Sequence, residues 1–389
     1  MIISNRRFTG LIYLLFVFIM LNAENREIRG VWIPDPGHTS LMHTYRNIKD
    51  GVADMKSLGI NTLFLCTYAK TEVAFKSDVY TKYSTFNSPE DSYMFSKYMD
   101  EYNQPEISPS GDPVRDLIDE AANNGMNVVF WFEYGFMGSH GPTPPSHPLL
   151  VKNPEWQSAG SDGKQAAYNK TDYYFNAYHP EVQEFLIELM EESIKLYPDV
   201  KGIQGDDRTP AMPRNSGYDA YTVSRYKSEH DGQIPPADYN EEKWVDWRLN
   251  ILNTFAKNLY GRVKSKGSQY LVCFAPNPYP WCKDNLMQDS QSWLKDGVVD
   301  LLSVQCYRFD NKAYEGTVRE AQNNIGAVTD KLVFNPGIIL KVGQRYLPGE
   351  SLKQQILINR ALGTNGETFF YNEGLKNKEI RSVLQELYK

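Results

Sequence analysis

The segment "VKGIQGDDR", residues 200–208, starts with apolar and β-branched residues and ends with two acids and an arginine. The apolar part is typical of a buried strand, in which successive side chains point to opposite faces. With Ile203 on the face toward surrounding helices, Gln204 and Asp206 lie on the inner face. The segment is therefore either a strand running into a solvated turn or a strand that presents carboxylates to an active site.

Seven further apolar runs of similar length occur along the chain, and amphipathic segments such as "DPVRDLIDEAANNG" separate them. Near-continuous apolar strands that alternate with helices indicate a parallel sheet covered on both faces. Eight such units predict an α/β fold, a single (β/α)8 TIM barrel. The seven runs are residues 27–34, 61–70, 127–136, 269–278, 299–308, 331–340 and 367–375.

The long connections of this predicted barrel all follow a strand and precede a helix. They are residues 71–111, 137–178 and 209–240, whereas short links such as "NNGMN" and "YPDVK" join a helix to the next strand. Long loops after the strands build the C-terminal face of a TIM barrel, where such enzymes have their active sites. The acids at the end of 200–208 then lie at the barrel mouth. Asp207 starts the loop or points outward, and Arg208 returns inward.

The N-terminus has the pattern of a secretory signal. Arg6 and Arg7 precede an apolar run at residues 11–21, and Ala23 supplies a small residue before a cleavage point. The run is shorter than the ~20 residues that a membrane-spanning helix needs. We expect residues 1–23 to be removed, residues 24–389 to form the barrel, and the protein to be periplasmic or secreted, with no membrane span left.

Composition narrows the classes of partner. The 389 residues carry a net charge of −7, so the chain has no basic surface for nucleic acid. The 26 Tyr and 7 Trp provide core side chains, and such rings also stack on the C–H faces of sugars. The four cysteines show no zinc-ligand spacing, and whether Cys273 and Cys282 form a disulfide is left open.

Several stretches in order resemble one family of bacterial proteins. They include "REIRGVWI" at 26–33, "LGINTLFL" at 58–65, "VKGIQGDDR" and "DGVVDLLSVQCY" at 296–307. With these motifs the chain resembles the glycosyl-hydrolase-10-like family, exported TIM barrels linked to cell-wall and other glycans. The resemblance implies that Gln305 and Tyr307 match a site motif "Q-x-Y". The fourth strand also resembles that of amylase-type barrels, which implies that Asp206 is a nucleophile or charge stabiliser.

The chain departs from the family pattern at the substrate end. Arg208 stands where the family has an aromatic residue after its two acids. Cys66 and Tyr68 stand where the family commonly has Gln and Arg late in the second strand. These differences concern specificity more than fold.

Glycoside hydrolysis generally uses two carboxylates that flank the scissile bond. Asp206 is the first, and the first choice for its partner is Glu133, which alternation places on one side with Trp131 and whose aromatic neighbours favour a protonated acid. Glu373 and then Asp310 are the next choices. An alternative is substrate-assisted attack through an N-acetyl group, oriented by the Asp206–Asp207 pair.

Other residues at the predicted strand ends are candidates for binding sugar hydroxyls and ring faces. They are His38, Tyr68, Trp131, Tyr134, Arg208, Asn277, Trp281, Gln305, Tyr307 and Asp310. The leading hypothesis is a glycoside hydrolase that cleaves a polysaccharide or oligosaccharide, with carbohydrate as its partner and no cofactor. The alternative is a non-catalytic glycan-binding barrel. A metal-dependent hydrolase is less favoured, because the chain lacks an HExxH or His-x-His pattern.

Overall fold

The computed structural model describes residues 27–102, 108–143, 146–326 and 332–388. Its main sheet is parallel, with strands in the order β12-β11-β10-β9-β5-β2-β1-β16-β13. Every apolar run predicted from the sequence contains strand residues of this sheet. Their bounds are β1 Ile28–Ile33, β2 Thr62–Cys66, β5 Asn127–Phe132, β9 Gly202–Gly205, β10 Leu271–Phe274, β11 Leu301–Leu302, β12 Val333–Phe334, β13 Gly337–Ile339 and β16 Gly366–Phe370.

The two edge strands of this sheet, β12 and β13, are consecutive pieces of one segment separated only by Asn335 and Pro336. The first piece pairs with β11 and the second with β16. Pro336 has no N–H to donate to a ladder, which accounts for the break. Because one segment joins both edges, the sheet closes on itself. The predicted (β/α)8 barrel is confirmed.

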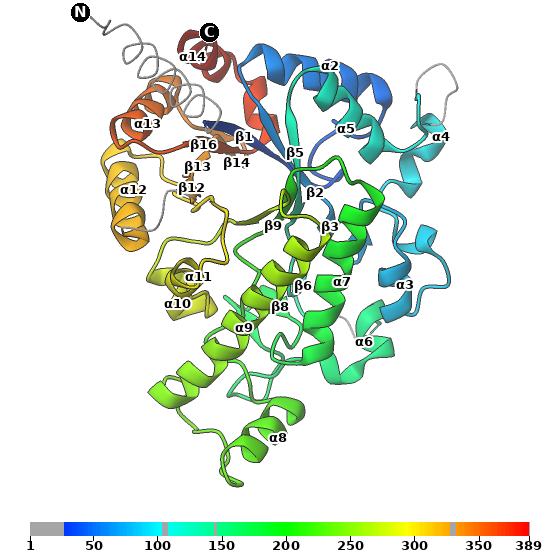
Figure 1. The fold of residues 1–389 in the computed structure, drawn as a ribbon, viewed down its shortest axis with the longest axis vertical. Helices are drawn as coiled ribbons and strands as arrows, with labels where there is room; N and C mark the ends of the chain where they lie inside the picture. Colours follow the sequence, from blue (N-terminus) through cyan, green and yellow to red (C-terminus); the bar gives the residue numbers. More distant parts are fainter. Residues whose placement is uncertain (1–26, 103–107, 144–145, 327–331, 389) are drawn as a thin grey trace, which may run out of the picture.

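Helices follow the strands and surround the barrel (Figure 1). Each amphipathic segment predicted from the sequence forms one of them, with apolar residues such as Val114 and Leu117 buried against the sheet side. The links from helix to strand are short; α5, for example, ends at Asn123 and β5 begins at Asn127. The helices are α2 Tyr45–Ser57, α5 Pro113–Asn123, α7 Pro180–Leu196, α9 Glu242–Lys266, α11 Ser290–Lys295, α12 Asn311–Ile325, α13 Gly349–Ala361 and α14 Lys378–Leu387.

The long connections after β2, β5 and β9 hold additional small elements, as expected for the C-terminal face. They are β3 Tyr68–Ala69, β4 Glu72–Val73, α3 Asp78–Tyr83, η1 Pro89–Ser92, η2 Ser96–Tyr98, α4 Met99–Tyr102, β6 Met137–His140, α6 Pro148–Lys152, η3 Pro154–Trp156, β7 Ala167–Tyr168, β8 Asp172–Tyr174 and α8 Ala220–Glu229. Later connections hold α10 Trp281–Leu286, β14 Lys341–Val342, β15 Arg345–Tyr346 and η4 Asn372–Lys376.

The barrel interior contains Gln204, as the alternation along 200–208 predicts. Its Oε1 accepts a hydrogen bond of 2.7 Å from Nε1 of Trp32 on β1. Strands β1 and β9 are not neighbours in the sheet, so this contact crosses the interior. The Trp131 ring lies 6.3 Å from that of Trp32 and helps to fill the barrel. The next inward position after Gln204 is Asp206, which brings a carboxylate to the top of this packed core.

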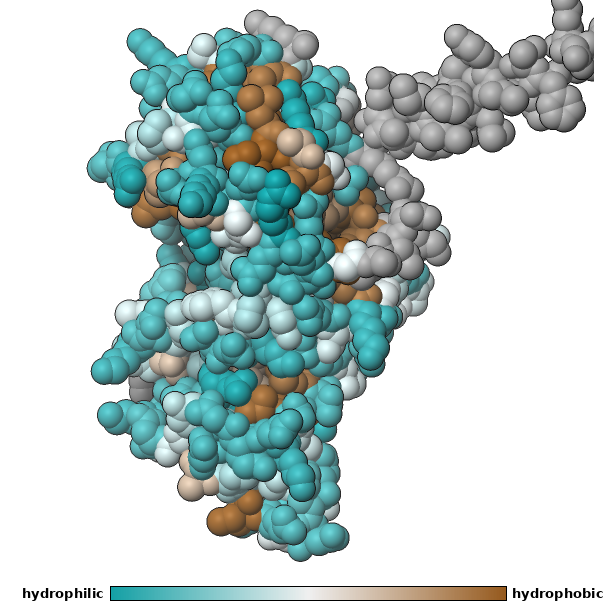
Figure 2. Space-filling view, turned by 90° about the vertical axis from the view of Figure 1, so that its left-hand side faces the viewer, coloured by the Kyte–Doolittle hydropathy of each residue, from teal (hydrophilic) through white to brown (hydrophobic). Residues whose placement is uncertain are grey.

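The surface is largely polar. Figure 2, which views the side that carries α12 and α13, shows a mostly hydrophilic face with apolar side chains in separate areas. No helix in the described part of the chain combines the length and apolar character needed to cross a membrane. The predicted signal segment, residues 1–23, lies outside the described residues.

Candidate active site

Asp206 is buried at the C-terminal end of β9, with 4% of the residue exposed. Its Oδ1 accepts hydrogen bonds from the backbone N–H of Asp207 at 2.7 Å and from Nε2 of Gln305 at 2.5 Å. Its Oδ2 accepts a hydrogen bond from Nη1 of Arg208 at 3.0 Å. Charged and amide donors therefore satisfy both oxygens of a carboxylate that burial alone would make costly.

Arg208 connects the acids of this site. Its Nη1 lies 3.3 Å from Oδ1 of Asp207 and 3.2 Å from the carbonyl oxygen of Glu133, in addition to its bond with Asp206. The guanidinium carbon lies 5.6 Å from the centre of the Tyr134 ring, within cation–π range. One cation thus joins the ends of the third and fourth barrel strands.

Glu133 lies beside Asp206 because their strands are neighbours. The register of β5 and β9 pairs Phe132 with Gly205, so the next residue of each strand is Glu133 and Asp206. Neighbouring strands are about 4.8 Å apart. The nearest donor to the Glu133 carboxylate is the thiol of Cys66, with Sγ 3.5 Å from Oε2.

Burial raises the pKa of the Glu133 carboxyl, the Arg208 charge opposes this rise, and the Asp35 charge adds to it. Burial also raises the pKa of Asp206, and the Asp207 charge raises it further against the opposing effect of Arg208. The Asp206 and Glu133 carboxyls therefore hold a proton more readily than separate, exposed acids do. Such coupled groups titrate as a unit, which suits a division into acid and base.

The loops after β5 and β9 are locked together at Gly135. This residue has a φ of +48°, and a Cβ there would lie only 1.6 Å from Oγ1 of Thr209. The N–H of Phe136 donates to the carbonyl of Arg208 at 3.1 Å. Only glycine fits this close approach, so the two acid-bearing strand ends have a fixed relation.

On the far side of Asp207 lies Asn277, whose Nδ2 donates to Oδ2 of Asp207 at 3.0 Å. Asn277 follows the fifth strand. The structure therefore brings together seven residues singled out in the sequence, from four successive strand ends. They are Glu133, Tyr134, Asp206, Asp207, Arg208, Asn277 and Gln305.

Tyr307 and Trp131 lie lower, where the site meets the barrel core. The Tyr307 ring packs 6.5 Å from Trp32 and 5.3 Å from Phe370. Burial, followed by the charges of Asp206 and Asp207, raises the pKa of Tyr307 well above its ordinary value. Trp131 is only 2% exposed, which makes it part of the floor and leaves no open ring face for a sugar.

An Asp–His pair follows the first strand. Nδ1 of His38 lies 2.9 Å from Oδ2 of Asp35, and the N–H of Gly37 donates to the other oxygen at 2.8 Å. The charges of both side chains act on Glu133, which places the pair beside the acid cluster. His38 was a sequence candidate and Asp35 was missed. The stretch "IPDPGH", with an acid just after an apolar run as in "QGDD", was the available signal.

Three other sequence candidates lie elsewhere. Tyr68 is fully buried and packs against Tyr80 and Phe185 of α7, so it belongs to the helical layer. Asp310 is exposed, and its Oδ1 caps α12 by accepting from the N–H of Ala313. Both contacts are structural in kind, and neither side chain contacts the acid cluster in the described residues.

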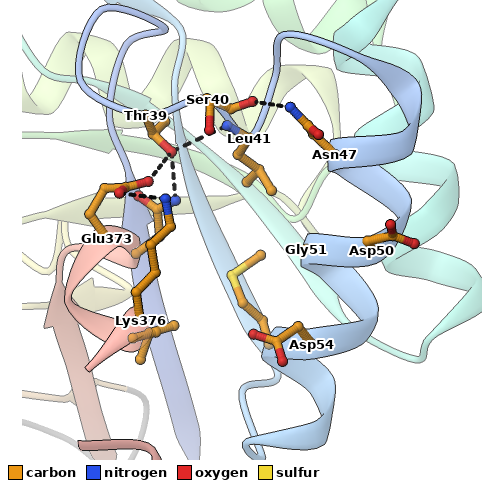
Figure 3. Close-up of a pocket in the computed structure, with 12 residues that line it drawn as sticks. Thr39, Ser40, Leu41, Asn47, Asp50, Gly51, Asp54, Glu373 and Lys376 are labelled. Carbon is orange, nitrogen blue, oxygen red and sulfur yellow. Dashed lines mark hydrogen bonds and ion pairs between the residues drawn. The ribbon is translucent and has the colours of Figure 1, made fainter. Parts of the chain in front are cut away.

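Glu373 lines a different pocket, of about 220 Å³, between α2 and η4. Its Oε1 accepts from the Thr39 hydroxyl at 2.9 Å, and its Oε2 pairs with Lys376 at 2.6 Å. Figure 3 shows Glu373 and Lys376 directed toward Thr39, with Asp54 facing them from α2. The carboxylate is already paired there and has no contact with Asp206.

Trp281 begins α10, in the loop after the fifth strand, and is 40% exposed. Its ring stands edge-on to that of Tyr168 in β7. The four cysteines are free thiols, Cys273 and Cys282 included. Within the described ranges, no group of three or more His, Cys, Asp or Glu side chains is arranged to hold a metal ion.

Comparison with known proteins identifies the family of this chain. The model of the family described as glycosyl hydrolase-like 10 matches residues 27–334. The chain belongs to this family. The resemblance noted in the sequence is thereby confirmed, and a glycoside hydrolase-like role follows from it. A comparison with curated protein sequences gives no match.

Solved glycosidase structures have the same fold as this family member. It is similar to the PgaB (BpsB) glycoside hydrolase domain from Bordetella bronchiseptica, with 16% identity, a TM-score of 0.61, and coverage of 93% of this chain and 99% of that one. The catalytic domain of a β-amylase from Paenibacillus polymyxa has 12% identity and a TM-score of 0.59 over 92% of this chain and 97% of its own. At these identities the likeness concerns the fold alone.

Proposed function

We propose that this chain is an exported glycoside hydrolase that cleaves O-glycosidic bonds of a polysaccharide or oligosaccharide, with Asp206 and Glu133 as its catalytic pair. The observation that carries the proposal is the convergence of the Asp206 and Asp207 carboxylates and the Glu133 backbone carbonyl on the Arg208 guanidinium, at the C-terminal end of the barrel. In TIM-barrel enzymes this face holds the active site. Residues 1–23 are proposed as the secretory signal.

The roles of the two acids follow from their donors. Asp206 accepts from Arg208, Gln305 and a backbone N–H, all of which favour its charged form. Within the described residues, the one hydrogen-bond donor to the Glu133 carboxylate is the Cys66 thiol, and burial raises the pKa of this carboxyl. Burial and the Asp207 charge raise the pKa of Asp206 as well, but three donors to its oxygens stabilise its charged form. We therefore assign the proton to Glu133, which donates it to the leaving oxygen. Asp206 acts on the sugar carbon as nucleophile, or activates water as base.

Asp207 and His38 are proposed to orient the substrate. The Asp207 side chain is 21% exposed, more than that of Asp206, and Asn277 fixes one of its oxygens. Its carboxylate can accept a hydrogen bond from a sugar hydroxyl or acetamido N–H. Asp35 holds Nδ1 of His38, and this leaves Nε2 for a sugar hydroxyl.

The test is release of sugar products by purified residues 24–389 from a panel of glycans that includes peptide-free peptidoglycan strands. Asp206→Asn and Glu133→Gln keep the size of each side chain and remove its charge, while Glu320→Gln changes an exposed acid on α12 as the matched control. Cleavage that both site variants lose and the control keeps supports the proposal. Cleavage that survives both site variants refutes this catalytic pair.

The second candidate is a glycan-binding barrel without turnover. It is favoured by one observation, namely that protein donors already occupy both oxygens of Asp206. This candidate predicts that glycan binds to the wild type and to Asp206→Asn with the same affinity and that no product is released. Product release by the wild type excludes it.

A further inference from the structure

The loops after the third, fourth and fifth strands form one continuous wall beside the acid cluster. Backbone hydrogen bonds connect each loop to the next. The N–H of Gly217 donates to Ala159 at 3.1 Å, that of Met212 to Leu286 at 3.0 Å, and that of Arg214 to Asn285 at 3.0 Å. The wall therefore holds the side chains on its edge in a defined position.

Trp281 stands on this wall with an open ring. Five of the seven tryptophans are 2% exposed or less, whereas Trp281 is 40% exposed. Its ring centre lies 5.7 Å from that of Tyr168, and the two planes meet at 87°. Tyr168 comes from the third-strand loop and Trp281 from the fifth-strand loop, so the pair joins two separate parts of the wall. An edge-on neighbour restrains the indole and leaves ring surface free.

A short, pinned segment connects Trp281 to the carboxylates. Asn277, four residues earlier, donates to Asp207, and the carbonyl of Tyr279 accepts from Nδ2 of Asn324 at 3.1 Å. Four residues span at most about 14 Å even when fully extended. The indole thus lies within an oligosaccharide's length of the acid cluster.

We infer that Trp281, positioned by Tyr168, is a stacking platform for a sugar unit beyond those held at the acid cluster. An aromatic face packs against the apolar C–H face of a pyranose, and the wall leaves the sugar's hydroxyls in water. The inference rests on the proposed function and deepens it, since it assigns a substrate class. The substrate is a linear polysaccharide long enough to reach from the acids to Trp281, and a disaccharide is too short.

Isothermal titration calorimetry tests the platform without any need for turnover. The probes are peptide-free peptidoglycan oligosaccharides and other linear glycans, each in a length series from disaccharide to octasaccharide, added to the Asp206→Asn protein. We expect the octasaccharide of the matching glycan to bind with measurable heat. Trp281→Ala should raise its Kd roughly ten-fold, equivalent to about 1.4 kcal/mol, and leave disaccharide binding unchanged. Trp281→Phe should retain most of the affinity.

Two control variants distinguish loss of the stacking ring from a general loss of structure. Trp247→Phe changes a half-buried tryptophan that packs on Trp244, and it should keep the octasaccharide response. Tyr168→Ala should weaken octasaccharide binding less than Trp281→Ala does, because it removes only the restraint. An unchanged octasaccharide Kd in Trp281→Ala overturns the inference. The same rise for the disaccharide overturns it too, as does a failure of every octasaccharide to bind.

The outcome for the platform is distinct from the outcome for catalysis. If long glycans bind through Trp281 but the wild type releases no product, the stacking platform is supported and the proposed hydrolase activity is refuted. If the wild type releases product and Trp281→Ala has the same KM at every chain length, the hydrolase activity is supported and the stacking platform is refuted.

Discussion

Asp206 and Glu367 are two buried acids at opposite ends of the barrel, 4% and 1% exposed. Glu367 lies at the start of β16, where Nδ2 of Asn359 donates to its Oε2 at 2.9 Å and the Tyr388 hydroxyl donates to its Oε1. Its hydrogen-bond partners come from α13 and from the residue that caps α14. Glu367 thus attaches two outer helices to the barrel base.

Burial raises the pKa of both acids, so neither burial nor a raised pKa distinguishes an active site from a structural one. The difference lies in the surroundings. Asp206 has two further acids and a guanidinium beside it, with Asp207 21% and Arg208 17% exposed at the mouth. Glu367 has neutral hydrogen-bond donors. A cluster of partly accessible charges at the strand C-termini marks the candidate site.

The largest contrast is expected in activity. On a glycan that the wild type cleaves, Asp206→Asn should lower kcat by about 100-fold or more, because it removes a group that acts in the transition state. Glu367→Gln should leave kcat unchanged. Initial rates at a saturating glycan concentration measure both. An equal loss of kcat in the two variants would show that the surroundings of Asp206 and Glu367 do not distinguish a catalytic acid from a structural one.

Removal of the cation should destabilise the mouth. In Arg208→Met the acids at 3.0 and 3.3 Å lose their partner, and an uncompensated buried charge costs about 3 kcal/mol of unfolding free energy near pH 7. Part of the loss should be recovered at a lower pH, because burial raises the pKa of Asp206 and its carboxylate takes up a proton there. Urea unfolding at the two pH values measures this, with exposed Arg319→Met as the control. A pH-independent loss would contradict it.

Glu367 should make stability depend on pH. Burial raises its pKa from 4.5 to about 7, so its contribution is fully present below pH 4.5 and is lost as the pH rises through about 7. At 1.36 kcal/mol per pKa unit the loss is about 3 kcal/mol. Glu367→Gln, whose amide oxygen can accept from Asn359 and whose amide nitrogen can donate to the Tyr388 hydroxyl oxygen, should remove this dependence. Denaturant midpoints measured across this pH range test the prediction. Plots of midpoint against pH that run parallel for the variant and the wild type would refute it.

The smallest effect is expected at Cys66. Its thiol contacts Glu133 and lowers the pKa of that carboxyl, so Cys66→Ala should raise this pKa. A general acid works in its protonated form, and the falling alkaline side of the pH–rate profile should therefore move to higher pH. Cys306→Ala, a buried thiol change outside the acid cluster, is the control. A shift to lower pH would argue against Glu133 as the acid.

Much of the architecture could be predicted because apolar runs of strand length are visible in the sequence. Alternation along 200–208 placed Gln204 inside the barrel, and the contact with Trp32 confirms it. Tyr68, which the family resemblance places late in the second strand, lies beyond the end of that strand. The strand ends at Cys66, and the chain then turns into the β3–β4 hairpin, which directs Tyr68 toward α7. Alternation predicts orientation only while a strand continues.

By itself the sequence determined the order of the barrel units, the face that carries the long loops, and the acids available at the strand ends, because periodicity and composition are local properties. Only the tertiary structure decided which acids meet. Strands β5 and β9 lie side by side, so Glu133 joins Asp206 across 73 residues of sequence, whereas Glu373 ends beside Lys376. Strand register and loop packing are long-range, and one residue's neighbours in the chain do not encode them.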